Sequence, residues 1–196
     1  MTRASQSEKQ ATHERIVAEA ARQIRERGTD QPSVAEIMAA AGLTHGGFYK
    51  HFASRDEMLA EAAERAMSAS EPLVAAVQAT EDPLAAFTDW YVSSAHRDDP
   101  GNGCGVAALG NDAARADAVR GAYRAQVTRY LELLQDMLGG DDADRRQRAA
   151  VTLSALVGAV VIARALGDTP TSDMLLADVG DAVRERRLLP ASHEKV

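Results

Sequence analysis

The sequence predicts an all-α protein, and three observations support this fold class. Ala, Leu, Arg and Glu dominate the composition, and runs of β-branched residues are few. Apolar residues recur at helical spacing along most of the chain, and Gly, Pro and capping residues mark the ends of these stretches. The chain has 196 residues, of which 45% are hydrophobic, so it is long enough to bury a substantial core.

Residues 33–59 predict two short helices joined by a tight turn and followed by the start of a third. Ser33 and Glu36 have the spacing of a capping box, which starts the first short helix. Gly42 is placed to end it, and Thr44 is placed to cap the second. Two short helices around a glycine turn are the pattern of a helix-turn-helix.

The second short helix has an unusual composition. Gly46 and Gly47 stand where helix propensity disfavours them, and they would let the backbone approach a flat surface such as the floor of a DNA major groove. Phe48 and Phe52, four residues apart, would anchor this helix to the core. Tyr49 would then face outward, with its hydroxyl free for a phosphate oxygen.

Residues 10–59 resemble the DNA-binding domain of the TetR family of transcriptional regulators. The most specific pieces are the AGLT turn, the GGFYKHF segment and the SRDEML start of the next helix. The resemblance implies a three-helix DNA-binding domain with a helix-turn-helix in residues 1–53. It implies a larger helical bundle for ligand binding and dimerisation in residues 54–196. The expected protein is a homodimeric, ligand-responsive repressor, whose partners are double-stranded operator DNA, a second copy and a small-molecule effector.

The same resemblance assigns the DNA contacts. It places phosphate contacts at Ser33, Thr44, Tyr49, His51 and Arg55. Such contacts set the position on DNA but carry no sequence information. The residues left to read base edges are His45, Gly46, Gly47 and Lys50, and a histidine can donate to guanine N7 or O6.

The charge distribution agrees with a DNA-binding end. The whole chain carries a net charge of −7. Residues 1–55 hold eight Lys or Arg against six Asp or Glu, and three of the five histidines, so the other 141 residues carry −9. A mildly basic head on an acidic body suits a protein that points one end at DNA.

The periodicity predicts the remaining elements. Residues 1–9 are expected to form a mobile arm, and Pro72 is expected to kink or break the helix that begins at Ser54. Residues 96–103 are expected to form a loop. The other predicted helices cover residues 10–27, 54–70, 82–95, 104–110, 113–138, 144–166 and 172–187.

The body offers candidates for a ligand cavity, although aromatics and methionines at helical spacing also form ordinary core. Gln126 interrupts an apolar stripe and Arg164 closes an apolar run, so either side chain could orient a ligand. Arg164 could equally pair with a carboxylate at a dimer interface or lie at the solvent end of its helix. The candidate lining residues are Trp90, Tyr91, Tyr123, Gln126, Met137 and Arg164.

The helix predicted over 144–166 is apolar nearly all round, so it is either central or in contact with another chain. In TetR-like proteins the last two helices pair with their copies in a four-helix interface, and both helical patterns fit that arrangement. The candidate interface residues are Leu153, Leu156, Val157, Val160, Val161, Leu175, Val179 and Val183.

Other classes of function find less support. No catalytic constellation, phosphate-binding loop or dinucleotide fingerprint is visible, so we expect neither an enzyme nor a cofactor. His96, Asp98 and Asp99 match no defined metal-site spacing, and Cys104 is read as a small buried residue rather than a redox sensor. The apolar run 149–163 is shorter than a membrane span, and the polar N-terminus suggests the cytoplasm. The alternatives are a helical ligand-binding protein or enzyme without operator binding, or an effector-independent regulator.

Overall fold

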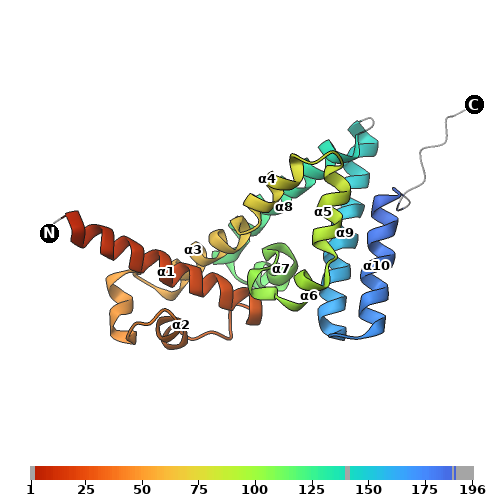
Figure 1. Ribbon diagram of the computed structural model, residues 1–196. Coiled ribbons are helices and arrows are strands. Elements are labelled where there is room, and N and C mark those ends of the chain that lie inside the picture. The colour runs from red at the N-terminus through yellow and green to blue at the C-terminus, as the bar shows by residue number, and fades with distance from the viewer. Residues whose placement is uncertain (1–2, 140–141, 187, 189–196) are drawn as a thin grey trace, which may run out of the picture. The chain divides into compact units, whose positions relative to one another are not determined.

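The computed structural model describes residues 3–139, 142–186 and 188, and within these ranges the regular elements are all helical (Figure 1). The predicted all-α fold is confirmed. The elements are α1 (Arg3–Arg27), α2 (Val34–Ala40), η1 (His45–Lys50), α3 (Arg55–Ser68), α4 (Glu71–Gln78), α5 (Pro83–Tyr91), α6 (Ser94–Asp98), η2 (Pro100–Asn102), α7 (Gly105–Arg115), α8 (Asp117–Leu138), α9 (Asp142–Leu166) and α10 (Pro170–Arg184), where η marks a 3-10 helix.

The helices pack into two compact units. The first unit combines the described residues up to Ala69 with residues 104–124, so α7 packs with the N-terminal helices. The second unit combines residues 70–103 with the described residues from Ala125 onward, and α8 contributes to both units. These units follow packing contacts. The functional division into residues 1–53 and 54–196 remains a prediction.

The core of the first unit forms where α1 crosses α3 and α2, and where α7 contacts α1 and α3. Ile16 and Ile24 of α1 are fully buried, as are Ile37 of α2 and Met58 of α3. Gly105 permits the close approach of α7 to α3, because a Cβ at Gly105 would lie 2.9 Å from a backbone oxygen of α3.

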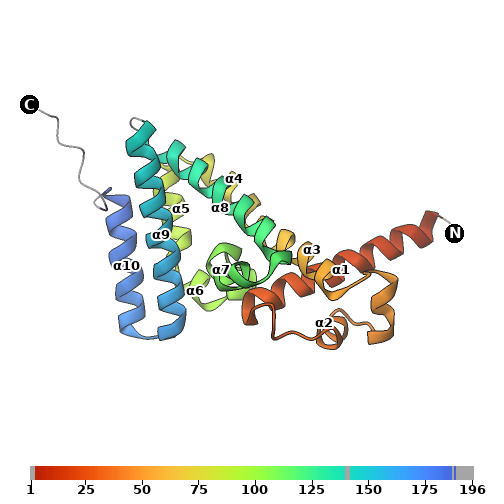
Figure 2. The same ribbon diagram turned by 180° about the vertical axis from the view of Figure 1, so that it is seen from behind.

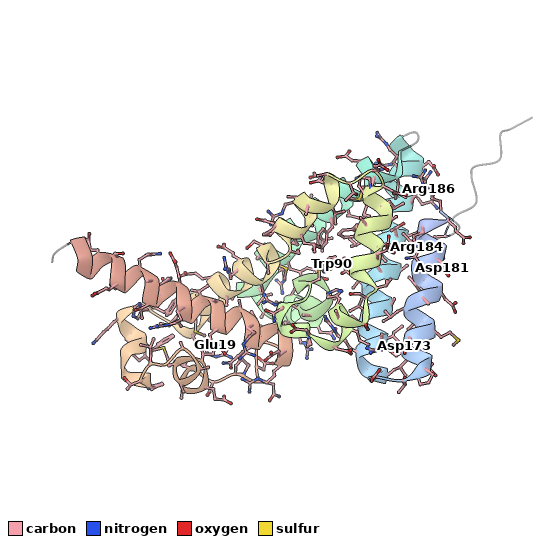
Figure 3. All side chains as sticks on the ribbon, in the orientation of Figure 1. Glu19, Trp90, Asp173, Asp181, Arg184 and Arg186 are labelled. Carbon is pink, nitrogen blue, oxygen red and sulfur yellow. The ribbon has the colours of Figure 1, made fainter. Side chains whose placement is uncertain are left out.

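The second unit is held by contacts of α9 with α10, α5 and α6, and by contacts of α5 with α4 and α10. The long antiparallel pair of α9 and α10 is seen from the other side in Figure 2. Polar contacts reinforce these helix pairs. Arg184, labelled with Asp181 in Figure 3, pairs with Asp181 within α10 and with Asp89 of α5. Buried Arg97 pairs with Asp173 of α10 at 2.7 Å.

Several segments differ from the sequence prediction. The helix predicted over 82–95 ends at Tyr91, and the first residues of the helix predicted over 113–138 belong to α7. The arm expected over residues 1–9 is helical from Arg3, because no Gly or Pro interrupts the chain before Gly28. Residues 96–103, expected to be a loop, contain the end of α6 and all of η2. Short-range caps explain the difference over residues 96–103, since Ser93 accepts from the His96 N–H and Asp99 accepts from the Asn102 N–H. The break predicted at Pro72 is confirmed, because α3 ends at Ser68 and Pro72 lies in the first turn of α4.

One helix among the described residues is long and apolar enough to cross a membrane by length and composition, over Asp144–Leu166 with a mean hydropathy of 2.1. This is weak evidence for a membrane span, because the core helix of a soluble protein passes the same test.

Candidate nucleic-acid interface and ligand groove

The first short helix begins and ends as the sequence predicts. Ser33 Oγ accepts from the Glu36 N–H at 3.2 Å, and Glu36 Oε2 accepts from the Ser33 N–H at 2.8 Å, which completes the capping box. The hydrogen bonds from Ser33 lower the pKa of the Glu36 carboxyl. Gly42 ends α2 with a φ of +74°, a left-handed conformation that favours glycine.

The second short helix of the motif is the 3-10 helix η1 rather than an α-helix. Thr44 stands at its N-cap but makes no side-chain capping hydrogen bond, and two adjacent glycines weaken helix propensity. The two glycines have different surroundings. A Cβ at Gly47 would lie 3.4 Å from Met38 Cε, whereas a Cβ at Gly46 would meet nothing within 4 Å. Gly46 therefore leaves open space in front of η1, as the sequence analysis requires for a close approach to DNA.

The aromatic residues of this segment divide between core and surface. Phe48 and Phe52 are each 2% exposed and stack with ring centroids 5.4 Å apart, and Phe52 also stacks on His13 of α1. Tyr49 is 74% exposed. Since Lys50 is exposed as well, η1 is anchored through its phenylalanines and presents polar groups outward.

Two of the predicted phosphate contacts, His51 and Arg55, lie in less open positions than the other three. His51 is half-buried, and burial, followed by the nearby charges of His13, Lys9 and Lys50, lowers its pKa. Arg55 donates to the carbonyls of Thr29 and Pro32, so it ties the loop before α2 to the start of α3. A phosphate contact by either residue remains a prediction. Ser33, Thr44, His45 and Gly46 are exposed.

A second tie to the same loop comes from α7. Asp112 Oδ1 accepts from both the N–H and the hydroxyl of Thr29, each at 2.7 Å, and Thr29 is only 3% exposed. This contact was not predictable from the sequence, because the partners are 83 residues apart and neither belongs to a motif. Asp112 therefore positions the chain that leads into the helix-turn-helix.

Of the residues predicted to line a ligand cavity, two lie in an aromatic cluster of the second unit. Tyr91 is fully buried, and half-buried Trp90 stacks on His96 with ring centroids 4.9 Å apart. His96 Nδ1 donates to the Tyr91 carbonyl at 2.6 Å, and burial lowers the pKa of His96 to about 4. His96 is therefore neutral at physiological pH.

Three other predicted lining residues have other surroundings. Arg164 donates to the carbonyl of His96 at 2.8 Å, so it braces the end of α6. Tyr123 belongs to the first unit, where its hydroxyl donates to the Val106 carbonyl at 3.4 Å. Met137 is half-buried on α8. A ligand contact by any of them remains a prediction.

Gln126, the sixth, lines a groove of about 390 Å³ between α4 and α8 in the second unit. Its side chain is 3% exposed, and its Oε1 atom has no hydrogen-bond partner among the described residues. Arg129 of α8 pairs with Glu71 of α4 at 2.8 Å across the groove. The groove is lined by Glu71, Val74, Ala75, Gln78, Gln126, Arg129, Tyr130, Glu132, Leu133 and Asp136.

Most of this groove was not predicted from the sequence. The signal that could have found it is the spacing of Gln126, Arg129, Glu132 and Asp136, which puts polar side chains at three- and four-residue intervals along one helix. No group of three or more His, Cys, Asp or Glu residues in the described part of the chain is arranged to hold a metal ion.

The outer face of α9 and α10 exposes large apolar side chains. The exposed fractions are 45% for Val161, 51% for Ile162, 40% for Leu166 and 58% for Met174. The eight predicted interface residues divide between the two sides of this helix pair. Exposed Val161 and half-buried Val157, Leu175 and Val179 are accessible, whereas Leu153, Leu156, Val160 and Val183 are buried within the unit's own core.

Comparison with known proteins agrees with this fold and with the helix-turn-helix segment. Residues 16–62 match the family model described as bacterial regulatory proteins, tetR family, and this segment contains α2, η1 and the start of α3. An HTH-type transcriptional regulator of Mycobacterium tuberculosis (strain ATCC 25618 / H37Rv) is 27% identical over 176 residues, covering 85% of this chain and 91% of the relative.

Solved structures are similar over nearly the whole chain. A TetR transcriptional regulator from Chloroflexus aurantiacus J-10-FL is 24% identical with a TM-score of 0.78, covering 91% of this chain and 97% of that one. The reduced form of Escherichia coli NemR is 20% identical with a TM-score of 0.75, covering 89% and 96%. The fold and the matched segment define a helix-turn-helix DNA-binding protein. Residues 16–62 therefore carry the DNA-binding helix-turn-helix of the tetR family of bacterial regulatory proteins, and the whole chain has the fold of TetR-family transcriptional regulators.

Proposed function

We propose that this regulator is a homodimeric repressor that binds a pseudo-palindromic operator in the cytoplasm and is released by a small-molecule effector. The observation that carries the proposal is the division of η1 into a buried and an exposed face. Phe48 and Phe52 fix the segment, while Tyr49 is 74% exposed beside exposed His45 and Lys50. Outward-facing polar and cationic groups on a rigid segment suit a negatively charged duplex.

Within this proposal the exposed residues have two roles. Ser33, Thr44 and Tyr49 contact phosphates, with His51 and Arg55 as further phosphate contacts at the edge of the motif. His45 and Lys50 read base edges, and Gly46 and Gly47 let the backbone come close to them. The open space in front of Gly46 supports this arrangement.

The proposed dimer pairs α9 and α10 with the same helices of a second chain. Exposed Val161, Ile162, Leu166 and Met174 support it, because large apolar side chains gathered on exposed parts of two packed helices suit an interaction surface. A two-fold pair would hold the two η1 segments at a separation that matches successive major grooves, about 34–36 Å. An effector that favours a different separation would release the operator.

Selection of bound sequences from a random DNA pool tests this function. We expect a palindrome whose half-sites are about one helical turn apart, and whose affinity falls as salt rises. Recovery of no preferred sequence at any salt concentration would overturn the proposal. That result would favour a helical ligand-binding protein whose head does not bind DNA.

A further inference from the structure

The groove between α4 and α8 is rich in unpaired negative charge. Glu132 and Asp136 both line it, both are exposed, and none of the ion pairs described for this chain involves either of them. They stand four residues apart on α8, where like charges repel each other. The one positive charge that lines the groove, Arg129, is paired with Glu71 at 2.8 Å. The groove therefore has a net negative lining that a bound cation would relieve.

A buried acceptor adds a second and independent feature. Gln126 is 97% buried, yet its Oε1 atom has no partner among the described residues. A buried polar atom without a partner is unfavourable, so a ligand that donates a hydrogen bond there gains more than it would in water. The Tyr130 hydroxyl does not fill this role, because it is engaged with Ser70 Oγ at 2.7 Å.

The groove also has an apolar side. Val74 and Ala75 of α4 and Leu133 of α8 contribute to its lining, and the volume of about 390 Å³ lies in the range of small-molecule sites. The groove therefore combines an apolar wall, two unpaired carboxylates and one unpaired acceptor. A ligand that matches these features has an apolar body and a positively charged N–H donor.

We propose that the α4–α8 groove binds a protonated amine with an apolar body, and that such a cation is the effector of this regulator. Glu132 and Asp136 bind the positive charge, Gln126 accepts an N–H, and the apolar wall holds the body. The regulatory half of the proposal rests on the proposed operator binding. The binding half does not, and it can be measured without DNA.

Calorimetry of the DNA-free protein with three probes of one shape tests the binding half. The probes are 1-naphthylmethylammonium, the neutral 1-naphthylmethanol and the anionic 1-naphthylacetate. We expect the ammonium to bind at least about tenfold more tightly than the alcohol, and the carboxylate to bind most weakly, because the lining repels it. Equal affinities, or a preference for the carboxylate, would overturn the proposal.

Substitutions then locate the site. The double variant Glu132→Gln, Asp136→Asn should remove most of the preference for the ammonium probe. Its affinity for the alcohol should stay unchanged. Glu64→Gln is the matched control, because it removes an exposed carboxylate from the first unit and should change nothing. An unchanged ammonium preference in the double variant would place the cation elsewhere and overturn the proposal.

The role of Gln126 has its own readout. Gln126→Met keeps the length of the side chain but removes the acceptor, so it should weaken the binding of 1-naphthylmethylammonium. It should not change the binding of the N,N,N-trimethyl analogue, which keeps the charge but has no N–H to donate. Equal loss for both probes would reduce Gln126 to a structural role and overturn its assignment as acceptor.

The regulatory half is tested by titrating the selected operator against the protein with and without saturating 1-naphthylmethylammonium. The effector assignment predicts that the cation weakens operator binding, and that the operator weakens cation binding by the same factor. A cation that binds in the groove without changing operator affinity would overturn the effector assignment. Failure to select any operator would instead overturn the proposed function and leave groove binding intact.

Discussion

The helix-turn-helix in the first unit and the helical body in the second unit differ in how far their polar and apolar groups find partners within the chain. In the first, side-chain hydrogen bonds hold the motif: Ser33 and Glu36 cap each other, and Arg55 and Asp112 bond to the loop before α2. In the second, Ile162 stays exposed on α9 and Gln126 keeps a buried acceptor without a partner. The contrast is one of degree, because His51 Nδ1 in the motif is also buried without a hydrogen-bond partner among the described residues. The difference that remains is that the exposed large aliphatic side chains of the described residues lie on α9 and α10 of the body.

The largest expected effect comes from a charge on the exposed apolar face of the body. Ile162→Glu would place an unpaired carboxylate in the proposed dimer interface, and we expect the dimer dissociation constant to rise by at least about 100-fold. Operator binding should be lost with it, because one chain reaches only one half-site. Sedimentation velocity measures the first effect and gel retardation the second. Ala76→Glu, at an exposed position on α4, is the control. An intact Ile162→Glu dimer would move the interface off this face.

The next effect concerns acid stability of the body. The pKa of His96 is about 4 in the fold against an ordinary value of 6.5, so folding favours the neutral ring. Its contribution is fully present above pH 6.5 and is lost as the pH falls from 6.5 towards 4, to the extent of about 3 kcal/mol. Urea unfolding at these two pH values should show a smaller difference in His96→Phe than in the parent. His45→Gln, at an exposed site, should leave the difference unchanged.

Because Trp90 stacks on His96, its fluorescence offers a second readout of the same titration. The emission should stay constant from pH 7 to about pH 5 and change near the pKa of His96, about 4. A fluorescence change centred near pH 6.5 would contradict the buried, neutral histidine.

The loop before α2 should be sensitive to a residue far away in the sequence. Asp112→Ala leaves the buried N–H and hydroxyl of Thr29 without their acceptor, which should cost about 2 kcal/mol of unfolding free energy. Asp112→Asn keeps an acceptor oxygen and should cost less. Urea denaturation at one protein concentration measures both. An Asp112→Ala variant as stable as the parent would show that this contact adds nothing.

The smallest effects separate two kinds of DNA contact on η1. Lys50→Ala should relax the preference at one operator position by about 1–3 kcal/mol, because a base contact is lost. Tyr49→Phe should weaken the binding free energy for all operator sequences about equally, by about 1 kcal/mol, because a phosphate contact is lost. Quantitative binding to a set of single-position operator variants distinguishes them. If Lys50→Ala only lowers affinity uniformly, Lys50 contacts phosphate and His45 remains the only side chain that reads bases.

The sequence predicted the motif well because its signals are local. The Ser33 capping box, the stop at Gly42 and the buried faces of Phe48 and Phe52 each depend on residues a few positions apart. The pattern could not show that η1 is a 3-10 helix, because two adjacent glycines leave both helical geometries accessible.

The body was harder to predict because its features depend on contacts between distant residues. Apolar periodicity marked α9 as a core helix but did not show which of its faces packs against the rest of the same chain. Buried Leu156 and exposed Val161 were therefore both predicted as interface residues. The groove depends on which face of α8 meets α4, and of its lining residues the sequence prediction singled out only Gln126, which interrupts an apolar stripe. The tie between Asp112 and Thr29 left no sequence signal at all.

The most direct test compares the full selected operator with a duplex that contains one half-site. If the motif reads DNA in pairs held by the body, two chains bind each full site, and the full site binds at least about 100-fold more tightly than the half-site. Ile162→Glu should reduce this ratio to near one. Binding of one chain to each full site, with the same affinity as for the half-site, would contradict the account.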